Sequence, residues 1–122
     1  MKFINTKVHG YFDYIYGVFL AISPWLFGFS KLPEVAAETY IPLFLGAFTI
    51  IYSLFTDYEM GMYRMINIRT HLAIDMFMGL FLVVSPWIFN FEDGAWLSHV
   101  TFGLIAILSA MFTSKRRLTR HA

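Results

Sequence analysis

The chain has 122 residues, of which 58% are hydrophobic, 20% are aromatic and only 14% carry a charge. A soluble domain of this length would leave too much of that apolar surface in water, so the composition favours a single domain in lipid. The absence of cysteine excludes disulfides and thiolate chemistry.

Four apolar runs follow in chain order, at about residues 8–29, 35–55, 71–91 and 94–113. Each is close to the roughly 20 residues that a helix needs to cross a bilayer core. The first run holds Asp13 and lacks a cleavage motif, so it is interpreted as a retained helix and not as a signal peptide. The sequence therefore predicts an all-α, four-helix transmembrane bundle, with residues 1–122 forming one integral membrane domain.

The basic residues predict an orientation. Eight of the nine Lys and Arg lie before the first run, between the second and third, or after the fourth, and only Lys31 lies in another loop. By the positive-inside rule, both termini and the central loop are expected in the cytoplasm, with the bundle in the cell (inner) membrane. The tail, residues 114–122, is expected to contact anionic lipid headgroups and not nucleic acid. Its basic side chains are Lys115, Arg116, Arg117 and Arg120.

An internal repeat organises the chain. The segment "FLAISPWLFGF" at residues 19–29 returns 62 residues later as "FLVVSPWIFNF" at residues 81–91, and Phe-Thr at 55–56 returns after 57 residues at 112–113. Each unit, about 8–56 and about 70–113, contains two runs, so each is predicted to be a helical hairpin. Two hairpins that insert in the same sense are most simply related by a pseudo-two-fold axis along the membrane normal.

A Ser-Pro-Trp tripeptide stands near the end of the first helix of each unit. The two copies are Ser23, Pro24, Trp25 and Ser85, Pro86, Trp87. The proline is expected to bend or end the helix, and the serine to hydrogen-bond the carbonyls that the proline releases. Each tryptophan follows a basic residue by 18 positions, or about 27 Å of helix, which predicts an anchor at the outer interface. A hinge or binding wall at the outer mouth is the alternative.

The longer pattern His-x3-Asp-x3-Gly-x5-Ser-Pro-Trp occurs twice, beginning at His9 and at His71. It resembles the SPW-repeat family of small bacterial integral membrane proteins, and the resemblance covers about residues 8 to 113. The resemblance implies a membrane location and a repeated hairpin with Ser-Pro-Trp in its first helix. It implies no particular activity.

Polar side chains near the start of each unit form a candidate polar cluster. The histidine and aspartate of each unit are four residues apart and share one helix face, and Gly17 or Gly79 extends that face to allow close helix packing. A carboxylate at that depth is expected to face the bundle interior, so the two units should bring their polar pairs together. The four residues are His9, Asp13, His71 and Asp75.

Three interpretations of this cluster stay open. The favoured one is a structural lock that fixes helix register. The second is a proton or ion site in a small transporter or channel, and the third is a divalent metal site. The nearly apolar stretches between Asp13 and Ser23 and between Asp75 and Ser85 argue against a water-filled pore in one monomer.

The expected function is a structural or accessory membrane protein, with a small transporter or channel as the alternative. No hydrolase, phosphate-loop or dinucleotide-binding motif is present, so we expect no enzymatic activity and assign no cofactor. Small residues on the helices leave self-association to a homo-oligomer open. The central loop between the second and third runs is expected to be a plain connector.

Overall fold

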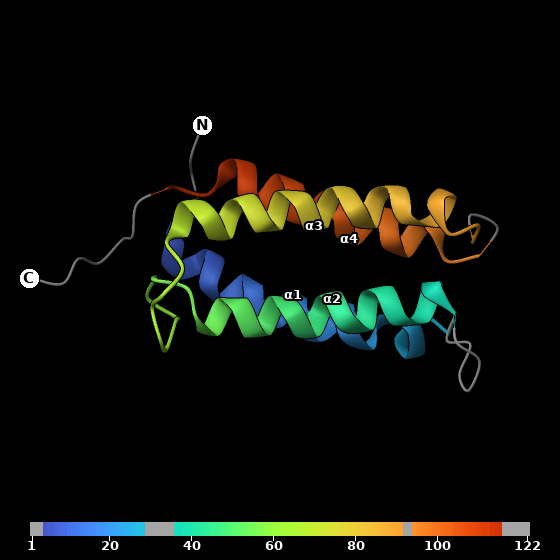
Figure 1. The fold of residues 1–122 in the computed structure, drawn as a ribbon, viewed down its shortest axis with the longest axis horizontal. Helices are drawn as coiled ribbons and strands as arrows, with labels where there is room; N and C mark the ends of the chain where they lie inside the picture. Colours follow the sequence, from blue (N-terminus) through green and yellow to red (C-terminus); the bar gives the residue numbers. More distant parts are fainter. Residues whose placement is uncertain (1–3, 29–35, 92–93, 116–122) are drawn as a thin grey trace, which may run out of the picture.

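The computed structural model describes residues 4–28, 36–91 and 94–115. These residues form helices α1 (Thr6–Leu26), α2 (Ala37–Leu54), α3 (Ile68–Ile88) and α4 (Trp96–Phe112) and contain no named strand. Helices α1 and α3 begin at the same end of the bundle, and α2 and α4 run back toward it (Figure 1). Helix α1 packs extensively on α2 and α3 on α4, with much sparser packing between the two pairs. The predicted all-α fold of two tandem hairpins is confirmed.

Helices α1 and α3 begin at equivalent asparagine caps. The Asn5 side chain accepts a hydrogen bond from the Val8 backbone N–H at 2.8 Å, and Asn67 accepts from the Thr70 N–H at 2.8 Å. Such a cap satisfies an N–H that the first helical turn leaves unpaired. The two caps are 62 residues apart, which is the shift of the sequence repeat. Each residue of α1 therefore lies as far from the start of its helix as its counterpart in α3.

Ser-Pro-Trp lies inside the last turns of α1 and α3. Pro24 has no N–H, so the Leu20 carbonyl four residues earlier lacks its helical donor. The Ser23 hydroxyl donates to that same carbonyl at 2.8 Å. In α3, Ser85 donates to the Leu82 carbonyl at 2.9 Å, four residues before the second proline. Both leucines are fully buried, so each serine satisfies an acceptor that water cannot reach.

The ends of α1 and α3 are also equivalent. Gly28 and Asn90, two residues past each helix, adopt φ values of 74° and 62°. Glycine and asparagine tolerate this left-handed conformation best, and they commonly follow a helix end. Trp25 and Trp87 are about half exposed at this end of the bundle, where α4 begins with the partly exposed Trp96.

A pair of glycines closes each hairpin. A Cβ built on Gly46 of α2 would lie 2.5 Å from the Gly17 carbonyl oxygen of α1, and a Cβ on Gly103 of α4 would lie 2.6 Å from the Gly79 carbonyl oxygen of α3. These neighbours are backbone atoms of a packed helix and cannot move aside singly. The tight contact within each hairpin therefore depends on both glycines.

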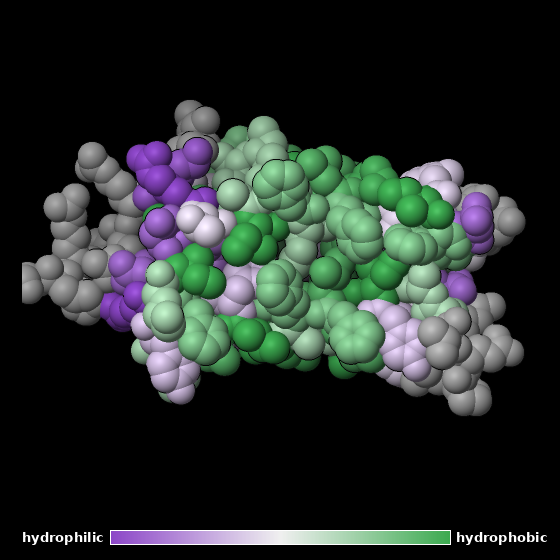
Figure 2. All heavy atoms as spheres, viewed as in Figure 1, coloured by the Kyte–Doolittle hydropathy of each residue, from purple (hydrophilic) through white to green (hydrophobic). Residues whose placement is uncertain are grey.

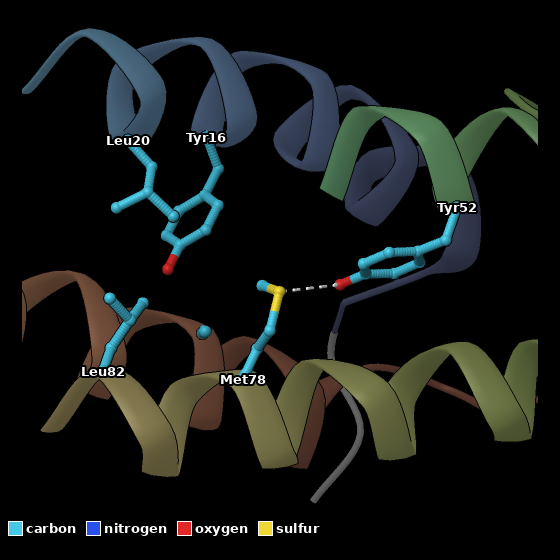
Figure 3. Close-up of a cluster of buried hydrophobic side chains, with 6 residues drawn as sticks. Tyr16, Leu20, Tyr52, Met78 and Leu82 are labelled. Atoms are coloured by element: carbon cyan, nitrogen blue, oxygen red, sulfur yellow. Dashed lines mark hydrogen bonds between the residues drawn. The ribbon is translucent and has the colours of Figure 1, made fainter. Parts of the chain in front are cut away.

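An apolar core joins the two hairpins. Tyr16 and Leu20 of α1 point toward Met78 and Leu82 of α3, and Tyr52 of α2 closes the group (Figure 3). These side chains are at most 6% exposed. The four side chains from α1 and α3 come one to two turns after the aspartate of the same helix, so the interior between the aspartates and the Ser-Pro-Trp segments is filled by apolar packing.

The outer surface is apolar across the middle of the bundle. Large side chains such as Phe44 and Phe77 are 63% and 74% exposed. Figure 2 shows hydrophobic residues over the centre of one face, with hydrophilic residues gathered chiefly at the end where α1 and α3 begin. Apolar exposure on this scale marks a surface that is covered by lipid or by another protein.

Part of the predicted charge pattern lies outside the described residues. Lys115, the last described residue, is exposed. The basic residues of this pattern that lie outside the described residues are Lys2, Lys31, Arg116, Arg117 and Arg120.

The Ser-Pro pairing gives a stability prediction. We expect Ser23→Ala to lower the free energy of unfolding by about 1–3 kcal/mol, because the buried Leu20 carbonyl loses its donor. In the double variant Ser23→Ala/Pro24→Ala, residue 24 regains an N–H that can reach the same carbonyl, so stability should recover. Thermal unfolding in detergent measures both. A double variant no more stable than the single one contradicts the explanation, and Ser85→Ala/Pro86→Ala repeats the test in α3.

Candidate functional site

The two predicted polar pairs meet between α1 and α3, and we refer to them as the His/Asp cluster. His9 Nε2 lies 2.9 Å from Asp75 Oδ2 and 3.1 Å from Asp13 Oδ1. His71 Nε2 lies 2.8 Å from Asp13 Oδ2 and 3.4 Å from Asp75 Oδ2. All four residues are at most 4% exposed. Each imidazole therefore faces the carboxylates of both repeats.

The second nitrogen of each ring reaches a threonine of the other repeat. His9 Nδ1 lies 2.8 Å from Thr113 Oγ1, and His71 Nδ1 lies 2.7 Å from Thr56 Oγ1. The repeat relates the two contacts: the histidine of the first repeat contacts the threonine of the second repeat, and the histidine of the second repeat contacts the threonine of the first. This crossed pairing ties the hairpins together with the approximate two-fold symmetry that the sequence repeat predicts.

Backbone hydrogen bonds hold the two threonines in position. Ile4 makes two of them, of 3.0 and 2.9 Å, to the residues on either side of Thr113. Ile66 makes the equivalent bonds, of 2.7 and 2.6 Å, to the residues on either side of Thr56. Each isoleucine directly precedes an asparagine cap, so one short segment both starts the histidine-bearing helix and fixes the threonine that the histidine contacts.

The threonine contacts determine where one ring proton sits. Thr113 Oγ1 donates to the Ser109 carbonyl at 2.5 Å, and Thr56 Oγ1 donates to the Tyr52 carbonyl at 2.6 Å. A hydroxyl has one hydrogen, so each threonine oxygen can only accept from the facing imidazole. Both histidines therefore carry a proton on Nδ1, and Nε2 is the nitrogen that faces the carboxylates.

Two tyrosines donate to the carboxylates. Tyr52 donates to Asp75 Oδ1, and Tyr58 donates to Asp13 Oδ2 at 2.8 Å. Burial raises the pKa of the Tyr58 hydroxyl, and the Asp13 carboxylate adds to the shift, so Tyr58 stays protonated as a donor. Tyr58 belongs to the central loop and is fully buried. The loop is thus not a plain connector, because it supplies one wall of the cluster.

His71 Nε2 is the least satisfied atom of the cluster. It lies close to two carboxylate oxygens but makes no aligned hydrogen bond with any described residue. The ring is fully buried and packs against Tyr52 and Tyr58, with ring centroids 4.8 and 5.2 Å away. A buried polar nitrogen in this state requires an explanation.

Sequence reasoning missed the residues around the cluster. The Phe-Thr duplication in the sequence was a signal for the two threonines, since it marks a position that both repeats share. The tyrosines gave no such signal, because the residues equivalent to Tyr52 and Tyr58 in the second repeat are Ser109 and Lys115.

His99 lies in α4, outside the cluster. It is buried, its Nδ1 lies 2.9 Å from the Ala95 carbonyl, and its ring centroid is 4.7 Å from that of Phe91. It is a local feature of the α4 start.

Two of the described helices, α2 and α3, are long and apolar enough to cross a membrane, and α4 is an apolar helix of 17 residues. The family model of the SPW repeat domain matches residues 7–113. The chain therefore belongs to the SPW-repeat family, and the apolar helices together with this family indicate a membrane protein. Comparison with curated proteins and with solved structures found no match.

The crossed pairing predicts the effect of changing a threonine. Thr113→Val keeps the shape but removes the acceptor of the His9 Nδ1 proton, so we expect a loss of about 1–3 kcal/mol in unfolding free energy. Thr113→Ser should be nearly neutral, and Thr101→Val, at an exposed site of α4, is the matched control. Thermal unfolding in detergent measures the stability of each variant.

Nitrogen-15 NMR of labelled histidine should show both Nδ1 atoms protonated in the unmodified protein, and an unprotonated Nδ1 contradicts the assignment.

Proposed function

We propose that this protein is a non-enzymatic, four-span membrane protein with a structural or accessory role, in which the His/Asp cluster fastens the two hairpins. The observation that carries this proposal is the crossed pairing of each histidine with the threonine and aspartate of the other repeat. Packing between the hairpins is otherwise sparse. Removal of the cluster would leave them joined mainly by the apolar core.

The lengths and charges of the helices support four spans. At 1.5 Å per residue, helices of 17 to 21 residues are about 26–32 Å long, which matches the hydrocarbon core. Lys7, Arg64, Arg69 and Lys115 belong to the end of the bundle where α1 and α3 begin. Placing this end on the cytoplasmic side of the inner membrane agrees with the positive-inside rule.

A groove beside α3 supports contact with anionic lipid. Arg69 and Lys115 line it together with the apolar Leu72, Met76 and Met111. Two cations above apolar side chains suit a lipid phosphate with its acyl chain below. Lys115, the first basic residue of the tail, is one of the two cations.

The transporter alternative receives less support. Tyr16, Leu20, Met78 and Leu82 fill the interior beyond the cluster, so the described residues of one chain offer no polar path across the bundle. A groove of about 350 Å³ between α1 and α4 reaches His9, but the residues that line it are mainly apolar.

Single-cysteine labelling tests the topology, and the chain has no native cysteine to interfere. Met62→Cys in the central loop and Gly94→Cys before α4 are both at exposed positions at opposite ends of the bundle. We expect an impermeant maleimide to label position 94 from outside spheroplasts and position 62 only in inverted vesicles. The reverse pattern contradicts the proposed orientation, and equal labelling of both from one side contradicts the spans.

Substitution of Asp75 distinguishes a lock from a transporter. Asp75→Asn keeps an oxygen that can accept from Tyr52, whereas Asp75→Leu leaves the buried Tyr52 donor with only its weak contact to the Met78 sulfur. We expect the leucine variant to be about 1–3 kcal/mol less stable than the asparagine variant in detergent. A transporter behaves differently: proteoliposomes would show proton or ion flux that Asp75→Asn abolishes with little change in stability, and that result would overturn the structural proposal.

A further inference from the structure

We infer that the His/Asp cluster is a binding site for one divalent transition-metal ion of the Zn²⁺ type, held by His9 Nε2, His71 Nε2 and one carboxylate oxygen each of Asp13 and Asp75. One ligand atom from each residue can be chosen so that all four lie within 4.8 Å of one another. The inference uses the same residues as the proposed lock but does not depend on the membrane topology or on a structural role.

The distances between ligand atoms suit a tetrahedral ion. With metal–ligand bonds of about 2.0–2.2 Å, the ligand atoms of a tetrahedral site lie about 3.3–3.6 Å apart. With Asp13 Oδ2 and Asp75 Oδ2 as the carboxylate ligands, three of the Nε2–oxygen distances are 2.8, 2.9 and 3.4 Å, and the fourth contact, of 3.1 Å, joins His9 Nε2 to the other Asp13 oxygen. A small outward adjustment of these atoms opens the centre of the cluster enough for an ion.

The orientation of the imidazoles is independent support. The threonine contacts place a proton on Nδ1 of both rings, so the lone pair available for coordination is on Nε2, which points at the cluster centre. Histidines that bind metal typically donate their other N–H to an outer hydrogen-bond partner in this way. His71 Nε2, fully buried and without an aligned hydrogen bond among the described residues, is an unused ligand atom aimed into the site.

The carboxylates have outer partners as well. Tyr58 donates to Asp13 and Tyr52 donates to Asp75, so every proposed ligand is held by a hydroxyl group outside the cluster. Such outer partners orient ligands and strengthen binding. An arrangement in which only protons are shared between His and Asp does not require Nε2 of both rings to converge on both carboxylates.

Charge and ligand type select the ion. Two carboxylates and two neutral imidazoles neutralise a divalent cation, so the loaded site carries no net charge in a low-dielectric interior. Any proton on Nε2 leaves to solvent as the ion enters. Imidazole nitrogen favours Zn²⁺ and its neighbours over Mg²⁺ or Ca²⁺, which prefer oxygen ligands alone.

The test is metal titration of the full-length protein in detergent, purified with a tag that contains no histidine and stripped with a chelator. We expect one equivalent of Co²⁺ per chain with the intense visible absorption of a tetrahedral site, and its displacement by one equivalent of Zn²⁺. His9→Ala and His71→Ala should each abolish the absorption. The other two histidines supply matched controls, so His99→Ala and His121→Ala should bind as the unmodified protein does.

A second set of variants keeps all four ligands. Thr56→Val and Thr113→Val, each verified as helical by circular dichroism, should weaken Zn²⁺ binding about 10–100-fold through loss of the outer hydrogen bond. A folded, stripped protein that shows no tetrahedral Co²⁺ spectrum, or binding that survives in both cluster-histidine variants, overturns the metal site. Neither result bears on the lock, which is judged by the stability of the Asp75 variants without metal.

Discussion

Burial of two carboxylates in an apolar helical bundle is the constraint on which the rest of this structure depends. A carboxylate without partners in such an interior is strongly destabilising, so Asp13 and Asp75 require donors from several directions. The His9 imidazole and two tyrosine hydroxyls supply them, and the His71 imidazole lies close to both carboxylates. Because these groups come from both hairpins and from the central loop, the arrangement that surrounds the carboxylates also fixes how the hairpins sit against each other.

The internal repeat makes this arrangement achievable with few residues. Equivalent asparagine caps start α1 and α3 at the same height, and equivalent glycine pairs set the same separation within each hairpin. A two-fold arrangement then places each histidine beside the threonine that ends the other repeat. The Ser-Pro pair acts at the opposite end, where serine replaces the donor that proline lacks, so the helix continues to the tryptophan at its end.

Much of this fold could be predicted from the sequence, because it follows from helical periodicity. A spacing of four residues places histidine, aspartate and glycine on one face, and the repeat indicates that two such faces meet. The contact between each histidine and the opposite threonine could not be predicted, since it depends on how the chain enters α1 and leaves α4. The role of Tyr58 was also hidden, because a loop residue gives no periodic signal and its counterpart in the second repeat is a lysine.

The two tyrosines show where the symmetry ends and what that implies. Tyr52 belongs to the first repeat and Tyr58 to the loop that follows it, yet Tyr58 donates to Asp13 and Tyr52 donates to Asp75. The histidine and threonine contacts are duplicated, so they define the part of the cluster that either repeat can build. The tyrosine donors are single, so the two carboxylates are not equivalent: Asp13 is held by a loop residue and Asp75 by a residue of a packed helix. Movement of the central loop would therefore remove the tyrosine donor of Asp13 and leave the tyrosine donor of Asp75 in place.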